Sequence, residues 1–421
     1  MISYLVEHNR YLCLIGILVV LSLAFILSKS RSKINYKLLV YALLMQFGIG
    51  FAMLRVFGGA SSTGGGLHFF ANLIQSLYGF ADQGVQFVFG NLANPSGSWG
   101  FIFAIKVLPI IIFFGALMSL LFYLGFVQKL VNLLGYLVRP ILGTSGAETL
   151  CAIANSFLGQ TEAPLLIRHY LANMTKSEMF VVMVSGMTTV SGAIMAVYVA
   201  MGVQAQHILV SALMAIPASI LIAKMIYPKI EASATDHGAS AENASSAKNI
   251  FDAISSGTVD GLGLAMNVGA MLVVFISLMA MLNALLGNCS VLINYLFNTS
   301  LPVISLNTVF AYLFSPFAYL LGLVGQEATY AAELLGTKIT INELVAFDKM
   351  MHMPQLTART QAILTYALCG FSNFSCIGIQ VGGIGALVPE KRVWLTEMGL
   401  MAVLASSLAN MLSALMVALL I

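Results

Sequence analysis

Two acidic residues occur in short polar segments that interrupt otherwise apolar sequence. Glu162 lies in NSFLGQTEAP at 155–164, and Glu343 ends GTKITINE at 336–343. A carboxylate at membrane depth is costly unless it meets a partner or a ligand. Both acids are therefore candidates to accept hydrogen bonds from a polar, uncharged solute, and a pair of carboxylates disfavours an anionic one. The alternative is that each acid caps a half-helix or pairs with a lysine, for which Lys338 is a candidate.

Amide, hydroxyl and aromatic side chains accompany the two acids. Gln160, Thr161 and Asn373 add hydrogen-bond donors and acceptors. Phe371 and Phe374 flank Asn373 and are suited to stack on a flat ring, although aromatic residues at this spacing are more often core residues. An amide with an acid suits the edge of a nucleobase. The other acid, together with Asn373, suits the vicinal hydroxyls of a ribose.

A cluster of hydroxyl side chains suggests a cation site. Thr188, Thr189 and Ser191 lie in SGMTTVSG at 185–192, where two glycines favour an unwound helix with exposed carbonyls. Together with Asn155, these oxygens suit a hard cation such as Na+. The alternative is that the hydroxyls bond to carbonyls of their own helix, as is common in membrane helices.

The composition is that of a polytopic membrane protein. The chain has 421 residues, of which 59% are hydrophobic and 8% charged, and its mean hydropathy is +0.94. Soluble domains carry about a quarter charged residues. The net charge of +3 is too small to favour a nucleic-acid partner. The five cysteines lack metal-type spacing and are expected to be small core residues without a disulfide.

Basic residues orient the predicted spans. The loop between spans at 11–28 and 37–57 carries Lys29, Arg31, Lys33 and Lys37. The positive-inside rule places this loop in the cytoplasm and the N-terminus outside, and the last span, 394–421, ends outside. Residues 67–94 are predicted to form an amphipathic helix at the outer interface or inserted obliquely. Residues 127–142 are predicted to form one along the inner surface.

The polar interruptions divide the chain into two similar halves. A glycine and a proline five residues apart would break a straight helix, so 143–171 is predicted to form a re-entrant hairpin. A second hairpin is predicted at 315–347, and each is followed by an interrupted helix, at 177–203 and 356–388. Charge placement makes the first hairpin enter from the cytoplasm and the second from outside. This is the inverted-topology repeat found in secondary transporters.

The prediction is an all-α polytopic membrane protein with about eight transmembrane helices, two re-entrant hairpins and interfacial helices. The polar, alanine- and serine-rich stretch 231–248 is expected to be a cytoplasmic linker between the two halves. The expected divisions are N-terminal helices with an external segment (1–100), a scaffold span with an inner interfacial helix (101–142), the first transport repeat (143–230), the cytoplasmic linker (231–250), a long scaffold span with an outer interfacial segment (251–314) and the second transport repeat (315–421).

Three segments resemble the signature segments of the concentrative nucleoside transporter family, namely NSFLGQTEAPLLIRHYL, LLGTKITINELVAF and CGFSNFSCIGIQVGGIG. They occur in the family's order, and the similarity runs from about residue 100 to the C-terminus. The resemblance implies a bacterial inner-membrane homotrimer that takes up nucleosides with a coupling cation. It also implies an elevator-like motion of the hairpin domain against a trimerising scaffold.

The resemblance assigns substrate-binding roles by position. Gln160, Thr161 and Glu162 match the positions that meet the nucleobase, and Glu343 with Asn373 matches the ribose-binding pair. The remaining matches are Phe371, an aromatic beside the base; Ile194, an apolar wall position; and Cys376, at a position facing the ribose. The family usually has serine at the last position, so the cysteine, a poorer hydrogen-bond partner, puts tight ribose binding or the rejection of deoxyribose in question.

The resemblance also implies a sodium site at Asn155, the Leu158 carbonyl, Thr189 and the Val190 carbonyl. The string GQTEAPL resembles the sodium-coupled branch more than the proton-coupled bacterial branch, which favours Na+ over H+ as the coupling ion. No cofactor is expected. The predicted function is therefore secondary active import of nucleosides, with uridine-like and purine nucleosides both candidates.

Other functions remain as alternatives to this prediction. A proton-coupled nucleoside symporter would use the same site, and a passive channel would keep the same residues without coupling. An intramembrane enzyme would use Glu162 with His169 or Glu343 as acid and base. The sequence offers no nucleophile or metal set at a suitable spacing for such an enzyme, so a non-enzymatic role is predicted.

Overall fold

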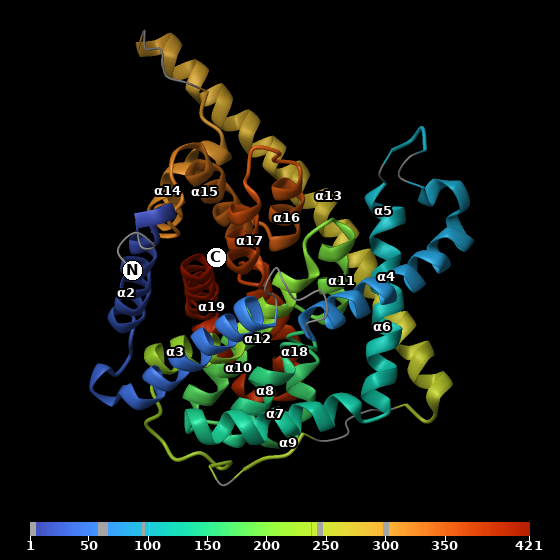
Figure 1. The fold of residues 1–421 in the computed structure, drawn as a ribbon, viewed down its shortest axis with the longest axis vertical. Coiled ribbons are helices and arrows are strands. Elements are labelled where there is room, and N and C mark those ends of the chain that lie inside the picture. The colour runs from blue at the N-terminus through green and yellow to red at the C-terminus, as the bar shows by residue number, and fades with distance from the viewer. Residues whose placement is uncertain are drawn as a thin grey trace.

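The computed structural model describes residues 6–57, 66–94, 97–100, 102–236, 238–241, 247–297 and 303–421, except for the side chains of 66–71. Within these ranges the regular elements are helices, as predicted (Figure 1). Seven of them are long and apolar enough to cross a membrane, or eight if the bent pair of α14 (Leu306–Leu320) and α15 (Gly325–Thr340) counts as one span. The seven are Glu7–Ile26, Tyr36–Val56, Phe103–Tyr123, Lys176–Ala200, Ala205–Ile226, Ile250–Phe297 and Pro389–Leu420.

The longest helix, α13 (Ile250–Phe297), packs along α6 (Leu108–Tyr123) through glycines. A Cβ atom added at Gly115 would lie 2.9 Å from the Gly257 carbonyl oxygen, and one at Gly257 would lie 2.5 Å from the Cβ atom of Ser119. Small residues of this kind let two membrane helices approach at backbone distance. In the most apolar stretch of α13 no residue is buried, whereas 94% of the corresponding stretch of Lys176–Ala200 is buried.

The buried body of the protein is formed by helices from both halves of the chain. Its centre is α12 (Ala205–Ile226) with α19 (Arg392–Leu420), which pack on each other and on α10 (Lys176–Thr188). On the N-terminal side, α2 (Arg10–Ile26) contacts α19 and α3 (Tyr36–Phe51) contacts α12.

Both predicted hairpins and both interrupted helices are present. The first hairpin starts with α8 (Gly146–Ala154) and returns through a 3-10 turn and α9, and the second is α15 with α16. The helix after each hairpin is interrupted between its two halves, and we call these two interruptions the first break and the second break. In the first hairpin the 3-10 turn is Ala163–Ile167 and α9 is Arg168–Leu171, and in the second α15 is Gly325–Thr340 and α16 is Glu343–Met351. The halves of the first interrupted helix are α10 (Lys176–Thr188) and α11 (Gly192–Ala200), and those of the second are α17 (Ala358–Leu368) and α18 (Ser375–Leu387).

The second hairpin begins later than predicted. The expected boundary between 314 and 315 falls inside α14 (Leu306–Leu320), which continues through Pro316. The chain then bends by 114° into α15, and the bend uses Gly322 and Gly325 at φ 77° and 60°, a conformation that glycine adopts without strain. Within the expected division 251–314, the long span extends to Phe297.

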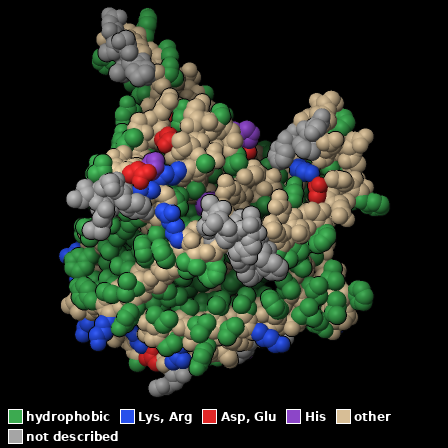
Figure 2. All heavy atoms as spheres, in the orientation of Figure 1, with side chains coloured by type: hydrophobic (Ala, Val, Ile, Leu, Met, Phe, Trp, Pro, Cys, Tyr) green, Lys and Arg blue, Asp and Glu red, His purple; other side chains and the backbone are tan. Residues whose placement is uncertain are grey.

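Peripheral helices complete the fold. Helix α4 (Gly66–Phe89) matches the helix expected at 67–94, and α7 (Phe126–Leu142) matches the one expected at 127–142. The short α5 (Phe103–Lys106) leads into α6. Figure 2 shows a broad band of hydrophobic side chains on one face, with lysine and arginine side chains along the edge where Figure 1 places α7.

Candidate solute-binding site

The second hairpin tip and the second interrupted helix bring Glu343 and Asn373 together. Glu343 is the first residue of α16, whose N-terminus is capped by Asn342. Its Oε2 atom accepts a hydrogen bond from Asn373 Nδ2 at 3.1 Å. Asn373 Oδ1 accepts from Ser375 Oγ at 2.6 Å and from the Cys376 amide at 3.2 Å. These bonds orient the Asn373 amide with its NH2 group toward the carboxylate.

The first hairpin tip reaches the same group through Cys376. Gln160 Nε2 donates to Cys376 Sγ at 3.3 Å, and Gln160 Oε1 accepts from Gln380 Nε2 at 3.1 Å. Gln380 also donates to the Met183 carbonyl at 3.0 Å. A continuous path of polar contacts therefore runs from Gln160 through Cys376 to the residues at the second tip. Sequence reasoning missed Gln380, although a buried amide within the apolar α18 was a usable signal.

The remaining predicted substrate residues surround this path. Thr161 lies against α18, because a Cβ atom at Gly383 would be 2.6 Å from Thr161 Cγ2. Glu162 is exposed, and its Oε2 atom accepts from the Gly159 amide at 3.3 Å. Ile194 is buried in the first turn of α11. Phe371 is half-buried at the second break, where its amide donates to the Thr189 carbonyl at 3.3 Å.

The predicted cation ligands lie between the first hairpin and the first break. Asn155 Nδ2 donates to Ser185 Oγ at 3.0 Å, while Asn155 Oδ1 is buried and has no hydrogen-bond partner among the described residues. Thr189 Oγ1 donates to the Ser185 carbonyl at 2.9 Å, and Thr188 Oγ1 bonds to the Val184 carbonyl at 2.7 Å. Both threonine hydroxyls thus bond to carbonyls of their own helix, which was the alternative to a cation site. A hydroxyl that donates its hydrogen still has lone pairs with which it can bind a cation.

Lys338 does not pair with a carboxylate in either hydrogen bond that it makes. Its ammonium donates to the Ala367 carbonyl at 2.7 Å and to Asn410 Oδ1 at 2.8 Å. The expectation of an ion pair with Glu162 or Glu343 is corrected accordingly. The backbone carbonyl lies in the last turn of α17, where a positive charge is favourable.

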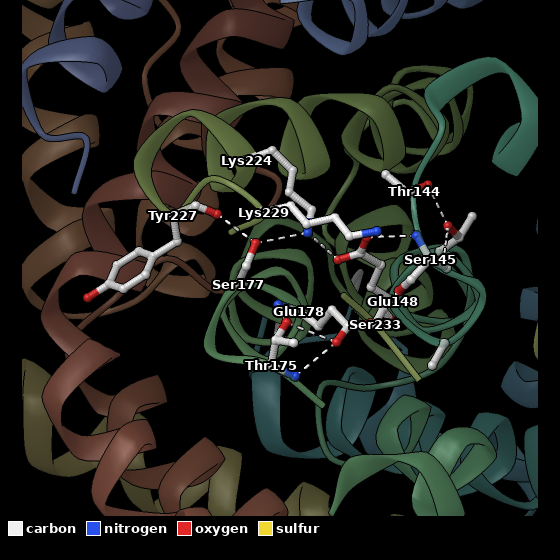
Figure 3. Close-up of polar contacts among 12 residues, drawn as sticks. Thr144, Ser145, Glu148, Thr175, Ser177, Glu178, Lys224, Tyr227, Lys229 and Ser233 are labelled. Carbon is white, nitrogen blue, oxygen red and sulfur yellow. Dashed lines mark hydrogen bonds and ion pairs between the residues drawn. The ribbon is translucent and has the colours of Figure 1, made fainter. Parts of the chain in front are cut away.

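A polar network at the base of the first hairpin was not predicted (Figure 3). Lys224 Nζ lies 2.6 Å from Glu148 Oε2 and donates to Ser177 Oγ at 2.9 Å. Glu148 and Glu178 each belong to a capping box, at the N-termini of α8 and α10. The motifs SGAE at 145–148 and TKSE at 175–178 were the sequence signal for these two boxes.

The first part of the predicted linker is hydrogen-bonded to this base. We call residues 233–236 and 238–241 the linker strap. The Thr235 carbonyl accepts from the Gly146 amide at 3.0 Å, and Ser233 donates to Glu178. At the far end, the Ala241 amide donates to Asn132 Oδ1 on α7 at 2.8 Å. The strap therefore joins α7 to the start of the first hairpin.

We expect Lys224→Met to lower the free energy of unfolding by about 3–5 kcal/mol, because it leaves the Glu148 carboxylate buried without its counter-ion. Thermal unfolding of the purified protein in detergent measures this. The double variant Glu148→Gln with Lys224→Met should recover part of the loss. Lys229→Met is the matched control: its ion pair with Asp236 is partly exposed, so it should cost at most about 1 kcal/mol. Equal losses for both lysines would contradict the prediction.

Three family profiles match the chain along its length. The profile described as Na+ dependent nucleoside transporter C-terminus matches residues 207–418, and the corresponding N-terminus profile matches residues 15–92. A profile described as nucleoside recognition matches residues 104–205. Together the three profiles cover the helices, both hairpins and both breaks described above.

Named relatives are similar over nearly the whole chain. Nucleoside permease NupC of Helicobacter pylori is 38% identical over 410 residues, which cover 95% of each chain. Sodium/nucleoside cotransporter 1 of Rattus norvegicus is 32% identical over 417 residues, covering 95% of this chain and 62% of the relative. The solved structure of CNTnw in an inward-facing substrate-bound state has a TM-score of 0.89 at 36% identity and covers 99% of both chains. Other CNTnw structures are described as outward-facing or intermediate.

Proposed function

The chain belongs to the concentrative nucleoside transporter family, and from this premise we propose that it is a secondary active importer that takes up nucleosides together with Na+. The observation that carries the proposal is the contact path from Gln160 on the first tip to Glu343 on the second. A solute that bridges the tips would meet amide, thiol and carboxylate groups in a row. Such a row suits a neutral solute with a polar ring at one end and hydroxyls at the other.

The two ends of the path suit the two parts of a nucleoside. Glu343 and the NH2 group of Asn373 offer acceptors and donors to the vicinal hydroxyls of a ribose. At the first tip, Gln160, Thr161 and Glu162 suit the edge of the base. The backbone-bonded carboxylate of Glu162 remains accessible at its other oxygen, so it can accept an N–H from the ring. Phe371 and Ile194 supply apolar surface for the faces of the base and the sugar.

The proposal that Na+ is the coupling ion is supported by Asn155. Its Oδ1 atom is the kind of buried oxygen that a hard cation satisfies, and among the described residues it has no other partner. The Thr189 hydroxyl and the carbonyls of Leu158 and Val190 would complete the protein's share of the ligands. A cation bound there would order the first tip and the first break, so that the nucleoside meets a partly ordered site. Linkage then requires that each ligand tighten the binding of the other.

We further propose an elevator-type mechanism in a homotrimer. The glycine-packed α6 and α13 would form the stationary scaffold, and the hairpins with their broken helices would move as a body. The relative CNTnw has been solved in inward-facing, outward-facing and intermediate states. The exposed apolar length of α13 leaves surface for neighbouring subunits and lipid. In a bacterial inner membrane, the basic edge seen in Figure 2 would face the cytoplasm and both termini would lie outside.

Uptake of radiolabelled nucleosides into proteoliposomes tests the proposed function. A panel of purine and pyrimidine nucleosides is measured with Na+ and H+ gradients imposed separately. Accumulation above equilibrium under the Na+ gradient is expected. Accumulation only under the H+ gradient would change the coupling ion, and equilibration without accumulation would favour a channel. Chemical alteration of the solute would favour an enzyme.

We expect Cys376→Ser to lower the KM for uridine about fivefold, because a hydroxyl is a better hydrogen-bond partner than a thiol by about 1 kcal/mol. Uptake of uridine and its deoxyribose analogues measures the effect, and the gain should be smaller for an analogue that lacks the contacted hydroxyl. Cys289→Ser is the control, since Cys289 is an exposed residue of α13. An unchanged KM in the Cys376 variant would remove this residue from the ribose site.

A further inference from the structure

A single amide on α19 connects the two broken helices and the second hairpin. Asn410 is 1% exposed. Its Nδ2 atom donates to the Thr188 carbonyl at 2.8 Å and to the Cys369 carbonyl at 3.1 Å. Its Oδ1 atom accepts from Lys338 Nζ at 2.8 Å and from Ser372 Oγ at 3.3 Å. The two backbone carbonyls lie at the first and second breaks, and the lysine belongs to α15.

The chemistry of these partners fixes the orientation of the Asn410 side chain. Backbone carbonyls only accept hydrogen bonds and an ammonium only donates them, so rotating the amide by 180° would leave both sides mismatched. All four hydrogen-bonding positions of the amide are used. A buried network with every member satisfied holds its parts in one arrangement. The side chain is therefore a rigid connection between the two breaks.

The close approach of the two breaks is visible independently at Gly370. A Cβ atom there would lie 2.5 Å from both Asn410 Oδ1 and the Thr188 carbonyl oxygen. The Phe371 amide also donates directly to the Thr189 carbonyl at 3.3 Å. The backbone of the second break thus fits against the first only with glycine at position 370 and the Asn410 amide between them.

The residues bonded to Asn410 are adjacent in sequence to both proposed ligand sites. Thr188 directly precedes Thr189, a proposed cation ligand, and Ser372 directly precedes Asn373, a proposed ribose ligand. A change in the backbone at the first break would shift the Thr188 carbonyl and hence the amide. The amide would in turn shift the second break. Neither Asn410 nor Lys338 needs to touch the solute or the cation for this to happen.

We propose that Asn410 is a positioning residue that couples cation binding at the first break to nucleoside binding at the second, with Lys338 holding the second hairpin in the same network. The inference rests on the proposed function and adds the route by which the two sites communicate. Ordering of the first break fixes the Thr188 carbonyl, and through Asn410 it fixes the loop that presents Asn373. Coupling of this kind changes the affinity of one ligand by about 5–150-fold when the other is bound.

Asn410→Asp is the discriminating variant. A carboxylate can still accept from Lys338 but cannot donate to the Thr188 and Cys369 carbonyls, so the link between the breaks is cut while the hairpin contact remains. Uridine binding to purified protein is measured by calorimetry in Na+ and in choline. The wild type should bind uridine at least about fivefold more tightly in Na+ than in choline. In the variant this ratio of the two affinities should fall below about twofold. Ser406→Ala, a buried change on α19 at a hydroxyl bonded within its own helix, should keep the wild-type ratio.

Gly370→Ala provides a second test if the aspartate variant does not fold. The alanine displaces the Asn410 amide from the opposite side and should also reduce the ratio, whereas a merely structural role would lower protein yield and leave the ratio intact. If the Asn410 or the Gly370 variant keeps the wild-type ratio of uridine affinities in Na+ and choline, the inference is overturned while the proposed function stands. A wild type that binds uridine equally in Na+ and choline would overturn both the inference and sodium coupling. Absence of uridine binding in the wild type would overturn the proposed function itself.

Discussion

Glu343→Gln is expected to reduce nucleoside uptake at least about 100-fold while leaving the protein folded and in the membrane. The substitution keeps the shape of the side chain but removes the negative charge that Asn373 Nδ2 contacts at 3.1 Å. Hydrogen bonds to charged groups contribute about 1.5–3 kcal/mol each, and a ribose diol would make two of them to this carboxylate. Initial rates of radiolabelled uridine uptake, normalised to the amount of protein in the membrane, measure the loss.

Asn373→Ala should give a loss of similar size, since it removes the other half of the ribose pair. Glu397→Gln is the matched control, because Glu397 is an exposed residue of α19 in an ion pair with Lys176 at 3.5 Å. Its uptake should be that of the wild type. If uptake were unchanged in both the Glu343 and Asn373 variants, the ribose assignment would be ruled out.

Replacement of Na+ by choline is expected to abolish uptake, and Asn155→Leu should raise the Na+ concentration for half-maximal uptake at least about 30-fold. The leucine removes a buried oxygen that has no other partner among the described residues. The loss of one cation ligand that contributes about 2 kcal/mol corresponds to a change of about 30-fold in the Na+ concentration for half-maximal uptake. The measurement is uridine uptake into proteoliposomes as a function of external Na+ at constant ionic strength.

The neighbouring residue supplies the control for the sodium prediction. Ser156 is also buried, but its hydroxyl donates to the Ala212 carbonyl at 3.0 Å, so Ser156→Ala should keep the sodium response. Uptake that persists in choline and follows an imposed pH gradient would identify H+ as the coupling ion. Equal sodium dependence in the Asn155 variant and the wild type would remove Asn155 from the cation site.

The broken helices could be predicted because their cause is local. Glycine and proline within 155–164, and glycines on either side of the Thr188–Thr189 pair, coincide with runs of polar side chains in otherwise apolar sequence, and this combination predicted the breaks. The start of the second hairpin could not be placed as well. The predicted boundary between 314 and 315 lies inside α14, which continues through Pro316, and the bend instead uses two glycines at positive φ.

Long-range polar partners could not be predicted from spacing. Lys338 was considered only as a possible partner of a carboxylate, whereas its partner Asn410 is 72 positions away. Glu148 and Lys224 are likewise distant in sequence, and periodicity says only which face of a helix is buried, not what meets it. Glu343 and Asn373 lie in contact, because the second hairpin, which carries Glu343, packs against the second interrupted helix.

The linker strap shortens the connection between the two halves of the chain. Its last residue, Ala241, is fastened to α7 through Asn132, and α13 begins at Ile250. By whatever route the chain runs between these two points, nine residues reach about 30 Å when fully extended. The bonded strap therefore leaves no more than this length of chain between α7 and the start of α13, and any displacement of α7 away from α13 must stay within that reach.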